Sequence, residues 1–229
     1  MSIADNVAAV RRRLEAAAPG RSVALVAATK MNDAARVREV IAAGADACGE
    51  NRVQELLAKN AEGAYAGAPL HFIGHLQKNK VKNVVGLVDL IESVDSGELL
   101  RLIDLRAAAL GIIQNVLIEI NIGGELSKSG AELSALPDIL AAAGALGHVS
   151  VRGLMAIPPI SAAPGANRPY FARMKELFVD IGEKKYDNTC MDVLSMGMSG
   201  DFEDAAAEGA TMVRVGSAIF GPRDYGPVN

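Results

Sequence analysis

The sequence predicts an α/β protein in which short strands alternate with helices along the whole chain. Short apolar runs recur, and each is followed by a segment whose apolar residues return at helical spacing. Gly, Pro, Asn or Asp marks most of the boundaries. Such alternation implies parallel strands with right-handed crossovers. Eight units in 229 residues favour one domain over residues 1–229, a closed (β/α)8 barrel of the TIM type.

An additional helix is expected before the barrel, over residues 3–18. Its apolar side chains have helical spacing: Ile3, Val7, Val10 and Leu14. Pro19 and Gly20 end it. The apolar run 23–28 then fits a strand buried on both faces. Asn32 or Asp33 can cap the next helix, which runs to residue 43 and ends at Gly44.

The remaining units follow in order. The expected strands are 46–49, 70–73, 87–91, 116–121, 149–155, 193–196 and 211–215. The expected helices are 51–59, one from Leu76, 97–110, 131–143, 169–181, 201–208 and a short one from Ser217. An open doubly wound sheet is the alternative. It normally has fewer strands and a phosphate loop after the first, and no G-x-G-x-x-G follows Ala28.

The composition narrows the class of protein. Half of the residues are hydrophobic and 22% are charged, as in globular proteins. The net charge is −4 and the basic residues are scattered, so nucleic-acid binding is not expected. The run from Lys78 to Lys82 is interpreted as a solvated helix face. Cys48 and Cys190 fit a reducing compartment, and we expect a cytoplasmic protein with no signal peptide and no membrane span.

Lys30 is the strongest candidate for a functional residue, because it directly follows the first predicted strand. In parallel barrels the active face lies at the C-terminal ends of the strands. Burial there disfavours the ammonium form, and a neutral amine attacks aldehydes and ketones. The alternative is a lysine that reaches solvent or pairs with a carboxylate.

The loops after strands seven and eight, residues 196–200 and 214–218, supply glycines, hydroxyls and backbone amides. Barrels of this type commonly bind phosphate there, at the N-terminus of a short helix. With Lys30, these loops imply a ligand that carries both a phosphate and a carbonyl group. Arg214, within strand eight, could donate to a pyridine nitrogen. Its alternative role is a salt bridge with Glu119 or Glu92.

Three further features carry weaker signals. His71 and His75 have a metal-like spacing, but no third ligand is evident, and no metal is expected. Asn51 and Gln54 open a helix, where they cap it or contact a ligand. Residues 127–130 follow strand five and are interpreted as a solvated loop, with gating of the site as the alternative.

Six stretches carry a family resemblance: AATK (27–30), GENRVQE (49–55), HFIGHLQ (71–77), GLMAIP (153–158), LSMGMSGD (194–201) and VRVGSAIFG (213–221). They resemble the pyridoxal phosphate homeostasis protein family, also called the PROSC or alanine racemase N-terminal-domain-like family. The resemblance implies a barrel that binds pyridoxal 5′-phosphate (PLP) as an aldimine of Lys30. It implies further contacts: Ser199, Gly216 and Ser217 around the phosphate, Arg214 near the pyridine nitrogen, and Asn51 and Met198 lining the pocket.

The sequence departs from the family pattern near these positions. The family often has Ser before the lysine and Thr after it, where this chain has Thr29 and Met31. A proline that commonly follows is missing, and Leu70 stands where an aromatic residue is usual. These changes could alter the shape of the pocket, but they leave the lysine and the phosphate loops in place.

Two functions follow from the resemblance, because family members act in vitamin B6 and amino-acid homeostasis without a clear catalytic activity. A PLP carrier or regulator is favoured, with no catalytic residues, a monomeric state and PLP-dependent apoenzymes as candidate recipients. An amino-acid racemase is the alternative. It needs acid-base groups on both faces of the substrate, and Tyr225 is the nearest candidate for the second face. A third hypothesis, which involves no PLP and does not come from the resemblance, is a Schiff-base aldolase acting on a sugar phosphate.

Overall fold

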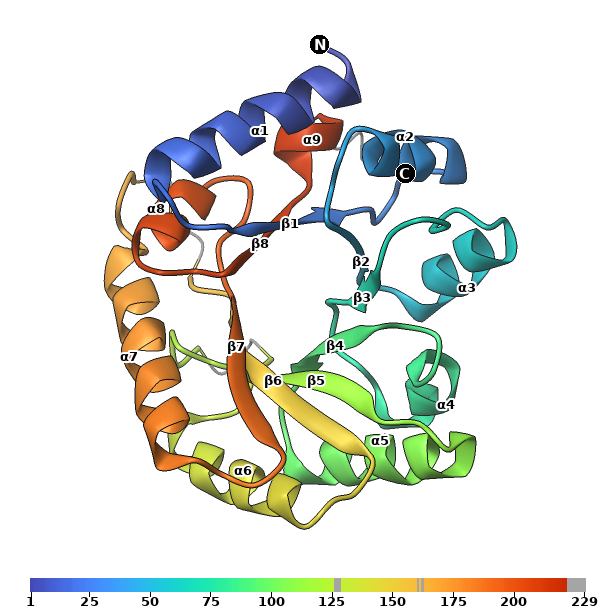
Figure 1. Ribbon diagram of the computed structural model, residues 1–229, viewed down its shortest axis with the longest axis vertical. Helices are drawn as coiled ribbons and strands as arrows, with labels where there is room; N and C mark the ends of the chain where they lie inside the picture. Colours follow the sequence, from blue (N-terminus) through green and yellow to red (C-terminus); the bar gives the residue numbers. More distant parts are fainter. Residues whose placement is uncertain (126–128, 160, 162, 222–229) are drawn as a thin grey trace.

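The computed structural model describes residues 1–125, 129–159, 161 and 163–221. Within that part, the parallel strands close into a barrel in chain order from β1 to β8, and β8 pairs with β1. Figure 1 shows the strands as an inner ring with the helices around it. The predicted (β/α)8 barrel with an extra N-terminal helix is confirmed. Three residues named above, Ser127, Lys128 and Tyr225, lie outside the described residues.

The elements have the following bounds. The strands are β1 (Ala24–Ala28), β2 (Ala47–Glu50), β3 (Leu70–Phe72), β4 (Leu90–Val94), β5 (Gln114–Ile120), β6 (Val149–Ala156), β7 (Thr189–Ser195) and β8 (Met212–Val215). The helices are α1 (Ile3–Ala17), α2 (Ala34–Ala42), α3 (Val53–Ala61), α4 (Val81–Val84), α5 (Gly97–Leu110), α6 (Leu136–Gly144), α7 (Arg168–Lys184), α8 (Phe202–Ala207) and α9 (Ser217–Phe220). Short 3-10 turns, Lys78–Lys80 and Leu133–Ala135, precede α4 and α6.

Helix α1 begins with a capping box, in which Ser2 and Asp5 each satisfy a backbone N–H of the other. Its buried stripe is the predicted one: Ile3, Val7, Val10 and Leu14. This stripe packs against α2, α8 and α9, and Figure 1 shows α1 lying across the last two. The start of the chain is thereby joined to α9, which opens at the C-terminal end of β8.

The barrel interior is filled in layers, as the alternation of strand side chains requires. One layer is apolar: Val26, Ala47, Leu90, Leu117, Met155 and Met212. Residues two positions further along a strand point to the same side of the sheet. Buried polar side chains therefore lie above this layer, towards the C-terminal ends of the strands: Glu92, Glu119 and Arg214.

Strand β4 differs from the prediction of 87–91. Gly86 has a left-handed backbone with φ +83°, and its N–H donates to the Gln114 side chain at 3.0 Å. Because Val85 and Val88 bridge across this bend, the apolar residues before β4 belong to a turn. Consequently Glu92 and Ser93 lie inside the strand, both fully buried, rather than after it.

Three other elements differ in extent. The helix expected over residues 131–143 begins only at Leu136, because Ala131 bridges to Ile120 and Leu133–Ala135 form a 3-10 turn. The helix expected from Leu76 is reduced to a 3-10 turn and the short α4. Strand β7 begins at Thr189 rather than at residue 193, because its polar start pairs with β6 and Asp192 forms an ion pair with Arg152. Among the described helices, none is both long and apolar enough to cross a membrane.

Candidate functional site

A cavity of about 360 Å³ opens at the C-terminal ends of the strands. This volume lies within the range of small-ligand sites, roughly 300–1,000 Å³. Every residue predicted for cofactor binding lines it: Lys30, Asn51, Met198, Ser199, Arg214, Gly216 and Ser217. The structure thus brings together side chains that are far apart in the sequence. The lining also includes Glu119, His75 and Ser129.

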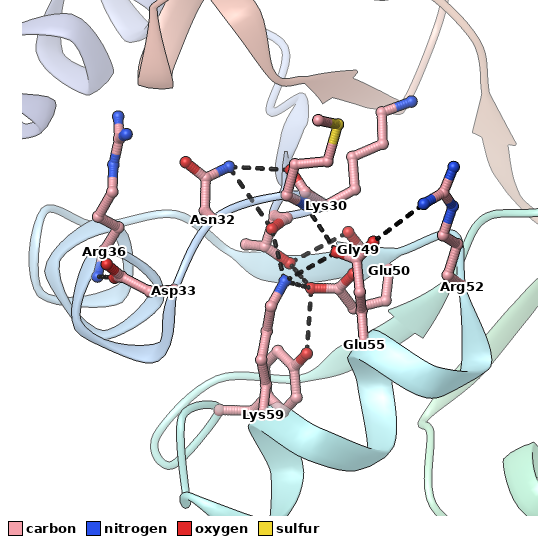
Figure 2. Close-up of polar contacts among 12 residues, drawn as sticks. Lys30, Asn32, Asp33, Arg36, Gly49, Glu50, Arg52, Glu55 and Lys59 are labelled. Atoms are coloured by element: carbon pink, nitrogen blue, oxygen red, sulfur yellow. Dashed lines mark hydrogen bonds and ion pairs between the residues drawn. The ribbon is translucent and has the colours of Figure 1, made fainter. Parts of the chain in front are cut away.

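Lys30 follows β1 and is half-buried at the wall of this cavity. Its carbonyl oxygen accepts a hydrogen bond from the Asn32 side-chain amide at 3.0 Å. In Figure 2 the Lys30 side chain points away from Lys59. Lys30 thus contributes to the cavity wall from the end of β1.

The loops after β7 and β8 meet around one oxygen atom. The Ser199 Oγ accepts hydrogen bonds from the backbone amides of Gly216, at 3.1 Å, and Ala218, at 3.3 Å. The Ser199 loop is itself fixed, since the Met198 N–H donates to the Asp201 carboxylate at 2.7 Å. Backbone amides that converge on an oxygen at a helix start are the groups that bind phosphate oxygens.

Gly197 gives this loop its shape. Its backbone is left-handed with φ +90°, and a Cβ there would lie 2.5 Å from the Cβ of Ala205. Glycine is required by both conformation and space. A residue of another type would push the Ser199 loop away from α8.

Arg214 lies beneath the cavity, 4% exposed. It donates to the Ser195 Oγ at 2.6 Å and to the Ala156 carbonyl at 3.0 Å, and its Nη1 lies 3.7 Å from the Glu92 carboxylate. The sequence left open whether Arg214 meets a pyridine nitrogen or a barrel carboxylate. The structure shows the contact with Glu92 and also places Arg214 in the cavity lining.

Glu92 is the centre of this buried network. Its Oε1 lies 2.8 Å from His71 Nδ1, and its Oε2 accepts from Ser195 at 2.6 Å. Burial alone would raise the pKa of Glu92, but the hydrogen bond and charge of His71, the charge of Arg214 and the Ser195 hydrogen bond hold that pKa below its usual range. Burial lowers the pKa of Arg214, although arginine stays protonated in proteins.

The two histidines considered as metal ligands do not act together. His71 is buried against Glu92, whereas His75 is exposed at the cavity edge with its Nδ1 3.6 Å from Asp95. Among the described residues, no group of three or more His, Cys, Asp or Glu could hold a metal ion.

Glu119 is a cavity residue that the sequence offered only as a salt-bridge partner. It is 3% exposed, and the Ser129 hydroxyl donates to it at 2.8 Å. Burial raises the pKa of Glu119, and the Ser129 bond and the charge of Arg214 oppose that rise only in part. Alternation along β5 could have identified it, because Glu119 lies two residues beyond Leu117 in the barrel interior.

Asn51 has a role that differs from capping. The first residue before α3 is Arg52, and no side chain caps this helix. The Asn51 Oδ1 is buried in the cavity wall and has no hydrogen-bond partner among the described residues. A buried amide oxygen without a partner is costly, so it favours a ligand that donates to it. Gln54 lines a smaller adjoining cavity, not this one.

Comparisons with known proteins agree with this geometry. The family model described as "Alanine racemase, N-terminal domain" matches residues 1–224. The pyridoxal phosphate homeostasis protein of Pseudomonas aeruginosa is 43% identical over 98% of this chain and 97% of its own length. A solved structure of PipY from Synechococcus elongatus, with PLP bound, has a TM-score of 0.82 and 34% identity, covering 96% of this chain and all of that one.

Larger enzymes share the fold alone. Alanine racemase from Streptomyces lavendulae matches with a TM-score of 0.76 and 23% identity, over 95% of this chain and 57% of the enzyme. The chain therefore belongs to the pyridoxal phosphate homeostasis protein family, within the alanine racemase N-terminal domain class of barrels.

Proposed function

We propose that this protein binds PLP in the barrel cavity, holds it reversibly through Lys30, and acts in PLP (vitamin B6) and amino-acid homeostasis. One observation carries the proposal: Lys30 lines the same cavity as Ser199 and Gly216, whose backbone amide donates to the Ser199 hydroxyl. Membership of a family whose curated relatives are named for PLP homeostasis, and the PLP-bound PipY structure, support it.

The residues present fit this cofactor. PLP supplies an aldehyde that bonds reversibly to a primary amine, and Lys30 provides the amine. The amides of Gly216 and Ala218 would hold the phosphate, with the hydroxyls of Ser199 and Ser217 beside them. Asn51, whose buried side-chain oxygen has no partner among the described residues, would face the bound cofactor.

The position of Arg214 supports a protein that holds PLP rather than one that uses it in catalysis. A guanidinium does not give up its proton, so an arginine beside the pyridine nitrogen would donate to it and leave the ring uncharged. An uncharged ring is a weaker electron sink than a pyridinium. We therefore propose a carrier or regulator rather than an enzyme, with apoenzymes that use PLP as recipients and a monomeric state. The free thiols Cys48 and Cys190 support a cytoplasmic location.

The visible spectrum of the purified protein with PLP tests the proposal. The wild type is expected to show the absorbance band of lysine-bound PLP, and Lys30→Ala is expected to lose it. Lys78→Ala is the matched control, because Lys78 is exposed and pairs only with the surface residue Glu98 among the interactions described. Absence of the band in the wild type, or its persistence in Lys30→Ala, would refute the role of Lys30.

A racemase is the second candidate, since Glu119 and His75 add acid-base groups to a cavity that contains Lys30. Exchange of the alanine Cα proton in heavy water measures this directly. Exchange at enzymatic rates that disappears in Glu119→Gln would replace the carrier with an enzyme. Exchange no faster than that of free PLP with alanine supports the carrier.

A further inference from the structure

A buried polar cluster lies behind Lys30, between the end of β1, β2 and α3 (Figure 2). It consists of Thr29, Glu50, Glu55, Lys59 and Tyr65, and we refer to it as the Lys59 cluster. Lys59 is only 7% exposed and Glu50 is fully buried, although both residue types are normally at the surface. No local pattern indicates this cluster, because Lys59 has the position of an ordinary helix residue.

Lys59 uses its three N–H donors on three different acceptors. Its Nζ lies 2.6 Å from the Glu50 Oε1, 2.8 Å from the Thr29 carbonyl oxygen and 3.4 Å from the Glu55 Oε2. The same Glu50 oxygen accepts from the Thr29 hydroxyl at 2.6 Å and from Tyr65 at 3.1 Å. The ammonium thus joins α3 to both β2 and the backbone next to Lys30.

A buried ion pair of this kind contributes little to stability by itself. Replacing such a pair with apolar residues of similar volume is often neutral or stabilising by about 1–4 kcal/mol. The role of this ion pair is therefore better explained by the backbone conformation that it stabilises. Here the ordered segment is the backbone of residues 29–31.

The backbone of Met31, next to Lys30, is strained. Its backbone is left-handed with φ +61°, a conformation that costs a residue with a Cβ roughly 1–2 kcal/mol. Its side chain is 53% exposed, so packing does not hold it. Its N–H donates to the Glu55 Oε2 at 2.7 Å, and this is the same oxygen that Lys59 contacts. Strain of this kind persists only where the surroundings enforce it.

We propose that Lys59 and Glu55 are positioning residues for Lys30. Lys59 fixes the carbonyl before Lys30, and Glu55 fixes the amide after it, so the backbone can present the Lys30 side chain only to the cavity. The side chain points away from Lys59, and the cluster therefore acts through the backbone (Figure 2). This inference rests on the proposed function, in which the Lys30 amine bonds to PLP.

Two sets of variants separate positioning from stability. Lys59→Met alone would leave the Glu50 carboxylate buried and unpaired, so the double variant Lys59→Met/Glu50→Gln removes both charges of that pair and leaves the net charge of the cluster unchanged. Glu55→Gln retains an oxygen that can accept from the Met31 amide, whereas Glu55→Leu removes it. Lys184→Met is the matched control, because Lys184 also pairs with an acid four residues earlier, Asp180, but on the exposed face of α7.

The first measurement is the rate at which the visible band of bound PLP appears after mixing with the PLP-free protein. The double variant and Glu55→Leu are expected to be on the order of 10- to 100-fold slower than wild type, as for a misplaced reacting group. Glu55→Gln is expected to stay within about threefold of wild type, because its side-chain oxygen can still accept the hydrogen bond from the Met31 amide. Lys184→Met is expected to match wild type.

The second measurement needs no PLP. Hydrogen exchange at the Met31 amide is expected to accelerate in the double variant and in Glu55→Leu, while amides in β5 keep their protection. Wild-type rates and wild-type Met31 protection in both variants would overturn the proposal, as would equal slowing by Glu55→Gln and Glu55→Leu. If the wild type itself gives no visible band with PLP, the proposed function fails, and the Met31 exchange still decides whether the cluster orders this backbone.

Discussion

Glu92→Gln is expected to destabilise the barrel strongly, because it removes the one carboxylate within 4 Å of the Arg214 guanidinium among the described residues. Glutamine keeps the shape of the side chain and can still hydrogen-bond Ser195, so the loss is mainly that of charge. Breaking a buried ion pair costs about 3–5 kcal/mol. The 3.7 Å separation, with Ser195 bonded to both partners, places the expectation near the lower end of that range, about 3 kcal/mol.

Thermal unfolding followed by circular dichroism at pH 7.5 measures this. For a chain of this length, about 3 kcal/mol corresponds to a fall in Tm of about 6–12 °C. Arg214→Met should be destabilising for the complementary reason. The double variant Glu92→Gln/Arg214→Met should lose less than the two single variants added together, by roughly 0.5–3 kcal/mol. Glu98→Gln is the control, because it breaks only the exposed pair with Lys78.

The pH dependence gives the reasoning a second test. The pKa of Glu92 is lowered in the folded protein, so its stabilising contribution is complete above its unfolded pKa, about 4.3. The contribution is lost as the pH falls towards the folded pKa. The Tm difference between wild type and Glu92→Gln should therefore shrink below about pH 4. A difference that stays constant down to pH 3, or strict additivity in the double variant, would refute the account.

The remaining predictions concern the cavity and its loops. Ser199→Ala should weaken the affinity for PLP about tenfold, measured by titration. The affinity for pyridoxal, which lacks the phosphate, should not change. Equal losses of affinity for the two ligands would show that Ser199 is not at the phosphate. Gly197→Ala should lower stability by about 2–4 kcal/mol in urea unfolding. Gly200→Ala is its control, because a Cβ there meets nothing within 4 Å. The pKa of Glu119 is raised in the folded protein, so its charged form destabilises the fold at pH values above its pKa in the unfolded chain. Glu119→Gln should therefore raise the Tm at pH 8 but change it little at pH 4. A lower Tm at pH 8 would contradict this.

The fold was predictable because its signals are local. Alternating periodicity and Gly or Pro boundaries predicted each unit, and the rule for parallel barrels then selected the residues at the strand ends. Helix α5 was predicted with the bounds found, Gly97–Leu110. Strand β4 was misplaced because an apolar pair, Leu87 and Val88, lies in a turn whose left-handed Gly86 has no distinctive sequence signal.

The side-chain contacts of the site residues were less predictable than the fold, because they depend on distances between different strand–helix units. The sequence offered Arg214 both a pyridine nitrogen and a carboxylate, and only the structure places it 3.7 Å from Glu92. Lys59 lies 30 residues from the Thr29 carbonyl that it contacts. Its burial follows from the close approach of α3 to the end of β1, for which the residues around Lys59 give no local pattern.

The network around Glu92 and the Lys59 cluster support different parts of the proposed site. The network around Glu92 fixes a permanent positive charge below the cavity, with Arg214 held by Ser195 and Ala156. The Lys59 cluster fixes the backbone that carries the amine. A rigid tether and a ring partner that cannot accept a proton favour tight, reversible holding over proton transfer at a substrate. Release of PLP would then require the bond at Lys30 to be broken by water or another amine, and the hydrogen bonds to the phosphate to be broken as well.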